Sequence, residues 1–215
     1  MIKLCNFQWV FLVAFMLFQG NVFGQQILGH YAASQVVENK LLHEDMVLVY
    51  PDRSTGVTNL WMQVDLTKNG AFIEMKDDNR RKLLQILEAY MELHDVISTP
   101  ESLPAKQNIG RFSTRAAFIA NSGDIYIDSF QDILLFMKFA KSGKKTLGIY
   151  VGKLEADKKK TETFEVPNLW LTMDEVKALY YELSDQNINR FLSNKGGAVN
   201  PEVLRILQED KEESK

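Results

Sequence analysis

The chain has 215 residues, of which 46% are hydrophobic and 25% are charged, as in an average soluble globular protein. This composition excludes a disordered chain, a collagen-like fibre and a polytopic membrane protein. The formal net charge of −3 at pH 7 gives the protein no overall basic field that would hold nucleic acid by its phosphates.

The N-terminal 24 residues have the pattern of a secretory signal peptide. Lys3 supplies a positive charge, residues 9–18 form an uninterrupted apolar run, and Val22 and Gly24 occupy the −3 and −1 positions of a cleavage site. The run is too short for a membrane anchor, because a spanning helix needs about 20 apolar residues. The pattern predicts cleavage after Gly24 and export, either to the periplasm or out of the cell, with no stable membrane span in the mature protein.

Cleavage determines what stabilises the mature protein. Residues 1–24 contain one lysine and the only cysteine, so the mature chain has a net charge of −4 and no disulfide. About 190 residues are enough to bury a stabilising core without cross-links. We expect a single domain over residues 25–192, with halves at 45–98 and 110–192. Residues 193–215 are expected to form a linker, a short helix and a charged tail.

The first half is predicted to contain a β-hairpin. Residues 25–44 are weakly patterned; their apolar residues could line a short helix, but no cap marks either end. Apolar and polar residues alternate over 59–66, which is typical of a strand with one buried face. The dipeptide Asn69-Gly70 predicts a tight turn with positive φ at both residues, and residues 71–75 return as the partner strand.

A helix is predicted at the end of each half. In the first half, helical spacing of apolar residues extends over 77–96, with Asp77 or Asp78 as the cap. In the second half, Thr172 and Glu175 form a capping box that marks the start of the helix. The strand segments expected between the two helices are 111–119, 125–127, 133–139 (strand or helix), 146–151 and 163–171.

These elements predict an α+β fold of antiparallel hairpins, with two amphipathic helices packed on one face and a further short C-terminal helix. The strand-to-helix junctions at 72–78 and 169–175 echo each other, which indicates a two-fold pseudo-repeat; two ordinary junctions would give the same echo. The layout resembles single-strand nucleic-acid-binding folds of the PUR or Whirly type. No motif of that family is present, and the export signal argues against a nucleic-acid partner.

Catalytic and cofactor motifs are absent from the sequence. The histidines His30, His43 and His94 lack metal-ligand spacing, and neither a Gly-x-Ser-x-Gly elbow nor a mature thiol occurs. Asp124 and Asp128 could share a proton or bind Ca²⁺, although acids beside turns more often bind backbone amides. We expect a non-catalytic binding or assembly module without a cofactor. The alternative is an exported hydrolase whose carboxylates are brought together only by the fold.

One face of the predicted strands carries aromatic and basic side chains. Trp61 and Gln63 share a face of one strand, Arg111 and Arg115 share a face of another, and Tyr150 lies on a third. Such surfaces bind glycans, peptides or proteins by stacking and by charge-assisted hydrogen bonds. If this face is open, we expect it to bind such a partner, with Trp61 as the anchor. The favoured interpretation is that the N-terminal segment, the tail helix or a second copy of the chain covers it.

Overall fold

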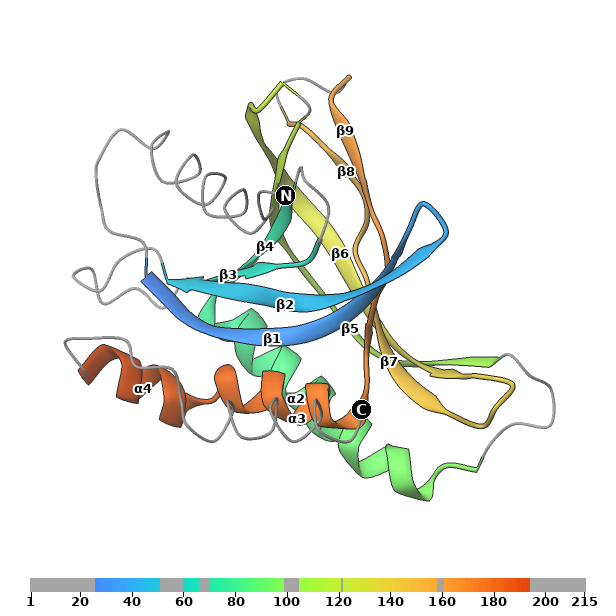
Figure 1. The fold of residues 1–215 in the computed structure, drawn as a ribbon. Coiled ribbons are helices and arrows are strands. Elements are labelled where there is room, and N and C mark those ends of the chain that lie inside the picture. Colours follow the sequence, from blue (N-terminus) through green and yellow to red (C-terminus); the bar gives the residue numbers. More distant parts are fainter. Residues whose placement is uncertain are drawn as a thin grey trace, which may run out of the picture.

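The computed structural model describes residues 26–50, 60–65, 70–98, 105–120, 122–157 and 161–193. The expected signal peptide, Asn69 of the predicted turn, and the linker and helix expected after residue 193 lie outside these residues. Within them the chain is mostly antiparallel sheet with three helices, in agreement with the expected α+β class (Figure 1).

Eight strands of the described part close into an antiparallel barrel. Around the barrel, each strand pairs with the next and the last pairs with the first, in the order β1 (Gln26–Val37), β10 (Leu169–Leu171), β7 (Lys145–Tyr150), β6 (Ile125–Phe139), β5 (Ala105–Ile119), β4 (Ala71–Met75), β3 (Leu60–Gln63) and β2 (Lys40–Tyr50). A separate hairpin of β8 (Gly152–Glu155) and β9 (Thr163–Val166) lies between β7 and β10 in the chain. Closure pairs these strands with neighbours on both sides.

The helices are α2 (Asp77–Val96), α3 (Met173–Glu182) and α4 (Asp185–Ser193). In Figure 1 the three helices lie beside one another on one side of the strands. The Asn79 amide of α2 donates a 3.1 Å hydrogen bond to the Ser113 carbonyl of β5. Gly110 of β5 also lies against α2, where a Cβ atom would be only 2.7 Å from Ile86 Cγ1. Glycine therefore lets the helix approach the strand closely.

The short helix considered for residues 25–44 is wrong, because residues 26–37 and 40–50 form the β1–β2 hairpin. The hairpin turns at Glu38 and Asn39, whose φ angles of 49° and 64° suit the tight turn that twisted strands favour. The alternation of strand residues is hidden in the sequence because the buried positions include Ala33 and Gln35. Small and polar buried residues weaken a hydrophobic period of two.

The strand β6 is continuous over Ile125–Phe139, whereas the sequence pattern predicts two separate segments, 125–127 and 133–139. Asp128 Oδ1 accepts a 3.1 Å hydrogen bond from the Phe130 amide, and Oδ2 accepts a 3.0 Å bond from the Glu155 amide. Asp124 binds the Ser122 hydroxyl at 2.9 Å in the preceding turn. Asp124 therefore has the ordinary local role of an acid in a turn, and Asp128 binds backbone amides of β6 and β8.

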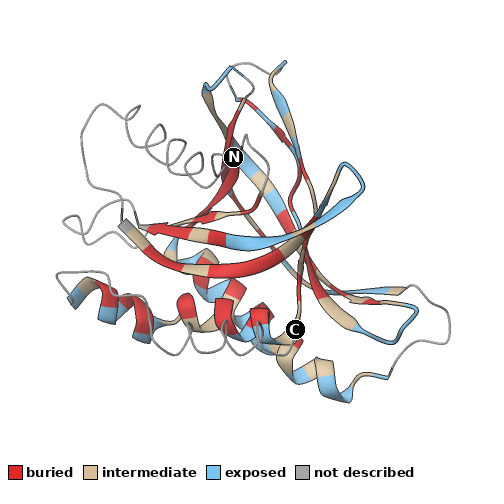
Figure 2. Ribbon diagram, viewed as in Figure 1, coloured by how far each residue is buried: buried red, intermediate tan, exposed pale blue. Residues whose placement is uncertain are grey.

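Alternating burial gives the barrel an inner face that belongs to the core and an outer face (Figure 2). Along β6 the buried residues are Ile133, Leu135, Met137 and Phe139. The residues between them, Leu134, Phe136 and Lys138, are partly exposed. A period of two places the second set on the outer face, away from the core.

The two helix starts differ in how well they were predicted. The capping box is confirmed: Thr172 Oγ1 accepts the Glu175 amide at 3.4 Å, and the Glu175 carboxylate accepts the Thr172 amide at 2.5 Å. The aspartate cap of α2 is wrong, because Lys76 is the N-cap residue and makes no side-chain capping bond. Asp77 is instead the first helical residue and accepts hydrogen bonds from Arg80.

Gly70→Val is expected to destabilise the fold by about 1 kcal/mol or more. Gly70 has a φ of 62°, a region that β-branched residues avoid. A Cβ atom would lie 3.6 Å from the Phe72 ring, so the loss comes from backbone conformation rather than from a clash. Urea unfolding measures it, with Gly70→Asn as control because asparagine tolerates positive φ. Equal losses for the two variants would contradict this explanation.

Candidate functional site

Two aromatic rings and two lysines gather on the outer face of β5, β6 and β10. We call Lys106, Phe136, Lys138 and Trp170 the lysine–aromatic group. The Phe136 and Trp170 rings meet edge to face, with centroids 5.5 Å apart and planes at 85°. Lys106 Nζ lies 4.8 Å from the Phe136 centroid, and Lys138 Nζ lies 4.2 Å from the Trp170 centroid. Both distances are within the range of cation–π attraction.

The strand register builds this group. Phe136 of β6 lies opposite Gly148 of β7, and Gly148 lies opposite Trp170 of β10. A Cβ atom on Gly148 would lie 2.5 Å from Phe136 Cζ. The missing side chain on the middle strand therefore makes room for the Phe136 ring to lie over it and meet Trp170.

The two lysines face each other across neighbouring strands. Lys106 of β5 is the direct partner of Lys138 of β6, which places their Cβ atoms about 5 Å apart. Within the described ranges, no carboxylate lies within 4.0 Å of either ammonium group. Like charges placed directly opposite each other destabilise a sheet. This pair is therefore a place where an anion would be stabilised.

Two residues of the predicted binding face, Arg111 and Tyr150, lie beside this group. Arg111 is the partner of Leu134 on β6, and Leu134 is the partner of Tyr150 on β7. Leu134 is two residues from Phe136, so this row is next to the lysine–aromatic group on the same face. Arg111 and Tyr150 are both exposed, Tyr150 by 40%. Their role in binding stays a prediction.

Trp61 and Arg115 come together on another part of the barrel wall. Trp61 of β3 lies opposite Glu74 of β4, and Arg115 Nη1 is 3.5 Å from Glu74 Oε1. Trp61 is partly buried and Arg115 is exposed. The structure therefore groups these two residues through Glu74, and groups Arg111 with Tyr150 through Leu134.

Gln63, the fifth residue of the predicted face, bonds the backbone of neighbouring residues. Its Oε1 accepts the Val47 amide at 3.1 Å, and its Nε2 donates to the Asp65 carbonyl at 2.9 Å. The Gln63 carbonyl in turn accepts a hydrogen bond from the buried Tyr31 hydroxyl. These contacts join β1, β2 and β3, which is a structural use of the side chain.

Sequence reasoning missed all four members of the lysine–aromatic group. Lys106 lies between the predicted helix at 77–96 and the predicted strand at 111–119, and Trp170 lies in the strand-to-helix junction at 169–175. Phe136 and Lys138 lie in a run selected for its hydrophobicity. The signal that could have found them is the alternation within 133–139, where an aromatic residue and a lysine occupy successive outward positions.

Ser34, His43 and Glu175 meet on the outside of β1 and β2. Ser34 Oγ lies 3.0 Å from His43 Nδ1, and Glu175 Oε1 lies 3.4 Å from the same nitrogen. A hydrolytic triad needs the nucleophile and the acid on opposite ring nitrogens, so that the histidine takes a proton from one while the other orients it. Since both groups contact Nδ1, this geometry does not activate the serine.

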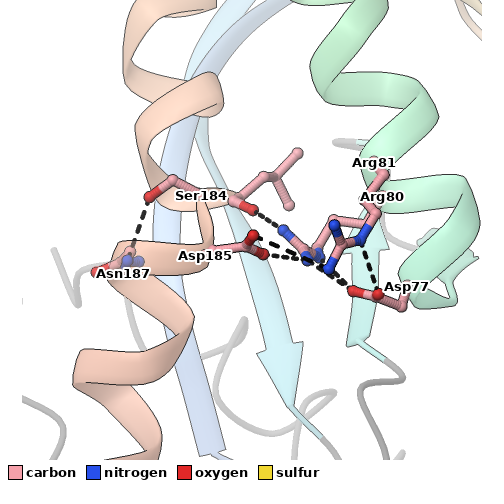
Figure 3. Close-up of polar contacts among 7 residues, drawn as sticks. Asp77, Arg80, Arg81, Ser184, Asp185 and Asn187 are labelled. Carbon is pink, nitrogen blue, oxygen red and sulfur yellow. Dashed lines mark hydrogen bonds and ion pairs between the residues drawn. The ribbon is translucent and has the colours of Figure 1, made fainter.

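A buried arginine connects α2 to the junction of α3 and α4 (Figure 3). Arg80 is 2% exposed, and its Nη1 donates to the Leu183 carbonyl at 2.7 Å. Its Nη2 lies 2.6 Å from Asp77 Oδ1 and 2.5 Å from Asp185 Oδ1. The hydrogen bond from Arg80 holds the pKa of Asp77 below its ordinary value. These carboxylates are therefore neutralised by an arginine rather than paired for acid–base chemistry.

Glu182, the last residue of α3, is a buried carboxyl group. A Cβ atom on Gly29 of β1 would lie 2.1 Å from Glu182 Oε2, so the carboxyl group lies directly on the strand backbone. Asn187 Nδ2 donates to Glu182 Oε2 at 2.8 Å. Burial raises the pKa of Glu182 to about 7, against the opposing effects of Asn187 and Arg190.

No protein-family model matches the chain, and neither a curated protein nor a solved structure matches it. The function proposed below therefore rests on the geometry of the described residues. In these parts of the chain, no helix is both long and apolar enough to cross a membrane.

Proposed function

We propose that the protein is an exported, non-catalytic binding protein whose outer barrel face binds an anionic partner. The observation that carries this proposal is the lysine–aromatic group, in which two opposed lysines lie over two partly exposed rings. Aromatic side chains with a nearby cation contribute strongly at binding surfaces. Arg111 and Tyr150 extend the same chemistry by one row of the sheet.

Export is the part of the proposal that rests on the sequence. The charged start, the apolar run at 9–18 and the small residue at Gly24 support secretion to the periplasm or beyond. The alternative of an exported hydrolase has weaker support. Both Ser34 and Glu175 contact the same nitrogen of His43, and Arg80 neutralises the two carboxylates that meet beside it.

We also propose that the two halves of the barrel are a structural repeat, with α2 and α3 packed on one common face. In chain order, four barrel strands and a helix occur twice, if the β8–β9 hairpin is an insertion. Ile86, the tenth residue of α2, lies against Gly110 of β5. In the same way Glu182, the tenth residue of α3, lies against Gly29 of β1. Both glycines lie where the strand register shifts. Such a correspondence supports duplication more strongly than two similar junctions do.

Trp170→Ala and Phe136→Ala are each expected to weaken binding to an anionic polymer while the protein stays folded. Both rings are on the outer face, so their loss removes contact area and releases the lysines from their positions over the rings. The measurement is retention of the chain from residue 25 on immobilised polygalacturonate and on immobilised polyglutamate, at low and raised salt. Wild type should be retained on at least one polymer and should elute with salt.

The matched control is Phe130→Ala. Phe130 is 74% exposed and lies six residues from Phe136 on the same strand, which is about 20 Å away. It should be retained like wild type, and circular dichroism should show all three variants folded. Lack of retention on both polymers, or equal retention of Trp170→Ala and Phe130→Ala, would refute the proposed site.

A further inference from the structure

The opposed lysines define what the ligand must carry. Lys106 and Lys138 are cross-strand partners, and no carboxylate within the described residues lies within 4.0 Å of either. Each ammonium group is positioned by a ring, Lys106 over Phe136 and Lys138 over Trp170. Like charges at directly opposed positions destabilise a sheet, and an acidic group bound beside both lysines would offset this.

The rings limit which anionic polymer fits. One face of each ring is covered by a lysine, and Phe136 also lies against Gly148. Bases of single-stranded nucleic acid bind by stacking on open ring faces. Lys106 and Gly148 occupy such positions at Phe136, and Lys138 occupies one at Trp170. The partly exposed rings and the lysine stems instead offer apolar surface beside the charges, which suits the C–H groups of a sugar.

The strand pairing around the lysine–aromatic group also disfavours an extended peptide. Residues 134–139 of β6, which include Phe136 and Lys138, pair with both β5 and β7, whereas β5 pairs with β4 only at residues 116–118. A peptide that extends the sheet by main-chain hydrogen bonds would therefore pair at the edge of β5, and not over Phe136, Lys138 and Trp170. A glycan does not need such an edge, because side chains alone can bind its ring faces and its acidic groups.

We infer that the ligand is an acidic glycan, whose carboxylate or sulfate groups bind Lys106 and Lys138 and whose sugar rings pack beside Phe136 and Trp170. Arg111, which lies on the neighbouring row of the sheet, binds a further acidic group of the polymer. This inference rests on the proposed binding function and specifies the class of its ligand.

The test titrates the tryptophan fluorescence of the chain from residue 25 with three soluble probes: tetragalacturonate, its methyl ester, and a glutamate tetrapeptide. The ester keeps the sugar rings and removes the charge, whereas the peptide keeps the charge and removes the rings. Tetragalacturonate should bind at least about tenfold more tightly than either of the other probes, the ratio expected from one charge-assisted hydrogen bond.

The variants are Lys106→Gln and Lys138→Gln, with Lys153→Gln as the control lysine on β8. Each of the first two should weaken tetragalacturonate binding about tenfold, and Lys153→Gln should leave it unchanged. Lys106→Gln should also raise the thermal midpoint of the free protein, because it removes the repulsion from Lys138. A lowered midpoint, or equal effects of all three variants, would overturn the assignment of the opposed pair.

The outcomes separate this inference from the proposed function. If the methyl ester binds as tightly as tetragalacturonate, or if the glutamate peptide alone binds, the acidic-glycan inference is wrong. The proposed binding function then still stands, provided that Trp170→Ala abolishes the observed binding. If no probe binds and neither immobilised polymer retains the protein, both are wrong.

Discussion

Replacing Arg80 with methionine is expected to lower the free energy of unfolding by about 3 kcal/mol, although Arg80 lies at no proposed binding site. Methionine keeps most of the buried stem but removes the guanidinium. The Leu183 carbonyl, which accepts its 2.7 Å hydrogen bond, would lose a buried partner. Asp77 and Asp185 would lose their shared cation, but both are partly exposed, so water can solvate them. The loss therefore comes mainly from the carbonyl and from the uncoupling of α2 from the α3–α4 junction.

Urea unfolding and a thermal melt measure this effect, and Arg81→Met is the matched control. Arg81 binds the other oxygen of Asp77 at 2.9 Å but is 59% exposed. Exposed ion pairs contribute little, because water and salt screen them, so the control should unfold like wild type. For Arg80→Met the midpoint should fall by roughly 6–12 °C. Similar midpoints for the two variants would show that Arg80 does not join the helices.

Turn and capping motifs in the sequence correctly predicted features that depend on only a few neighbouring residues. Gly70 has the positive φ expected of a turn, and the capping box at Thr172 marks the start of α3. Each depends on a few neighbouring residues, so one sequence contains the information. The helix α4 had a similar signal, since the Ser184 hydroxyl accepts the Asn187 amide at 3.2 Å, but it was not recognised.

The strand β1 was not predictable in the same way. Its inward positions include Gly29, which makes room for Glu182, and Gln35, whose amide donates to the Val64 and Pro167 carbonyls. These residues fit their places only because distant segments meet them. A hydrophobic period cannot reveal a buried position that is filled by glycine or by a hydrogen-bonded amide.

The candidate site depends on register, which the sequence does not specify by itself. Lys106 and Lys138 are 32 positions apart in the chain and become neighbours only in the β5–β6 ladder. Trp170 meets Phe136 only because β7 separates them with Gly148. The prediction of an aromatic and basic outer face therefore named Arg111 and Tyr150, beside this group, but none of its members.

The free energy of unfolding is expected to fall as the pH rises from 4.5 to about 7, and Glu182 is the reason. In the folded protein, burial against Gly29 raises the pKa of this carboxyl group from 4.5 to about 7. Between these two pH values the folded protein keeps a proton that the unfolded chain has released. Unfolding then releases a proton, so rising pH favours the unfolded state.

The contribution is complete below pH 4.5 and is lost as the pH passes through about 7. A shift of this size corresponds to about 3 kcal/mol, because each pH unit contributes about 1.4 kcal/mol. Groups such as Asp77, whose pKa is lowered, have the opposite sign and act at lower pH, where stability is lost as the pH falls. They do not cancel the effect above pH 5.

Glu182→Gln should remove this pH dependence. The glutamine carbonyl can still accept the hydrogen bond from Asn187 that Glu182 Oε2 accepts at 2.8 Å, and the amide does not ionise. Urea unfolding at pH 5 and pH 8 is the measurement. The variant should be more stable than wild type by only about 1 kcal/mol at pH 5 and by about 3 kcal/mol at pH 8. The control Glu165→Gln, at an exposed position of β9, should follow wild type at both pH values. Parallel pH profiles for wild type and Glu182→Gln would show that the carboxyl group ionises in the folded protein as it does in the unfolded chain.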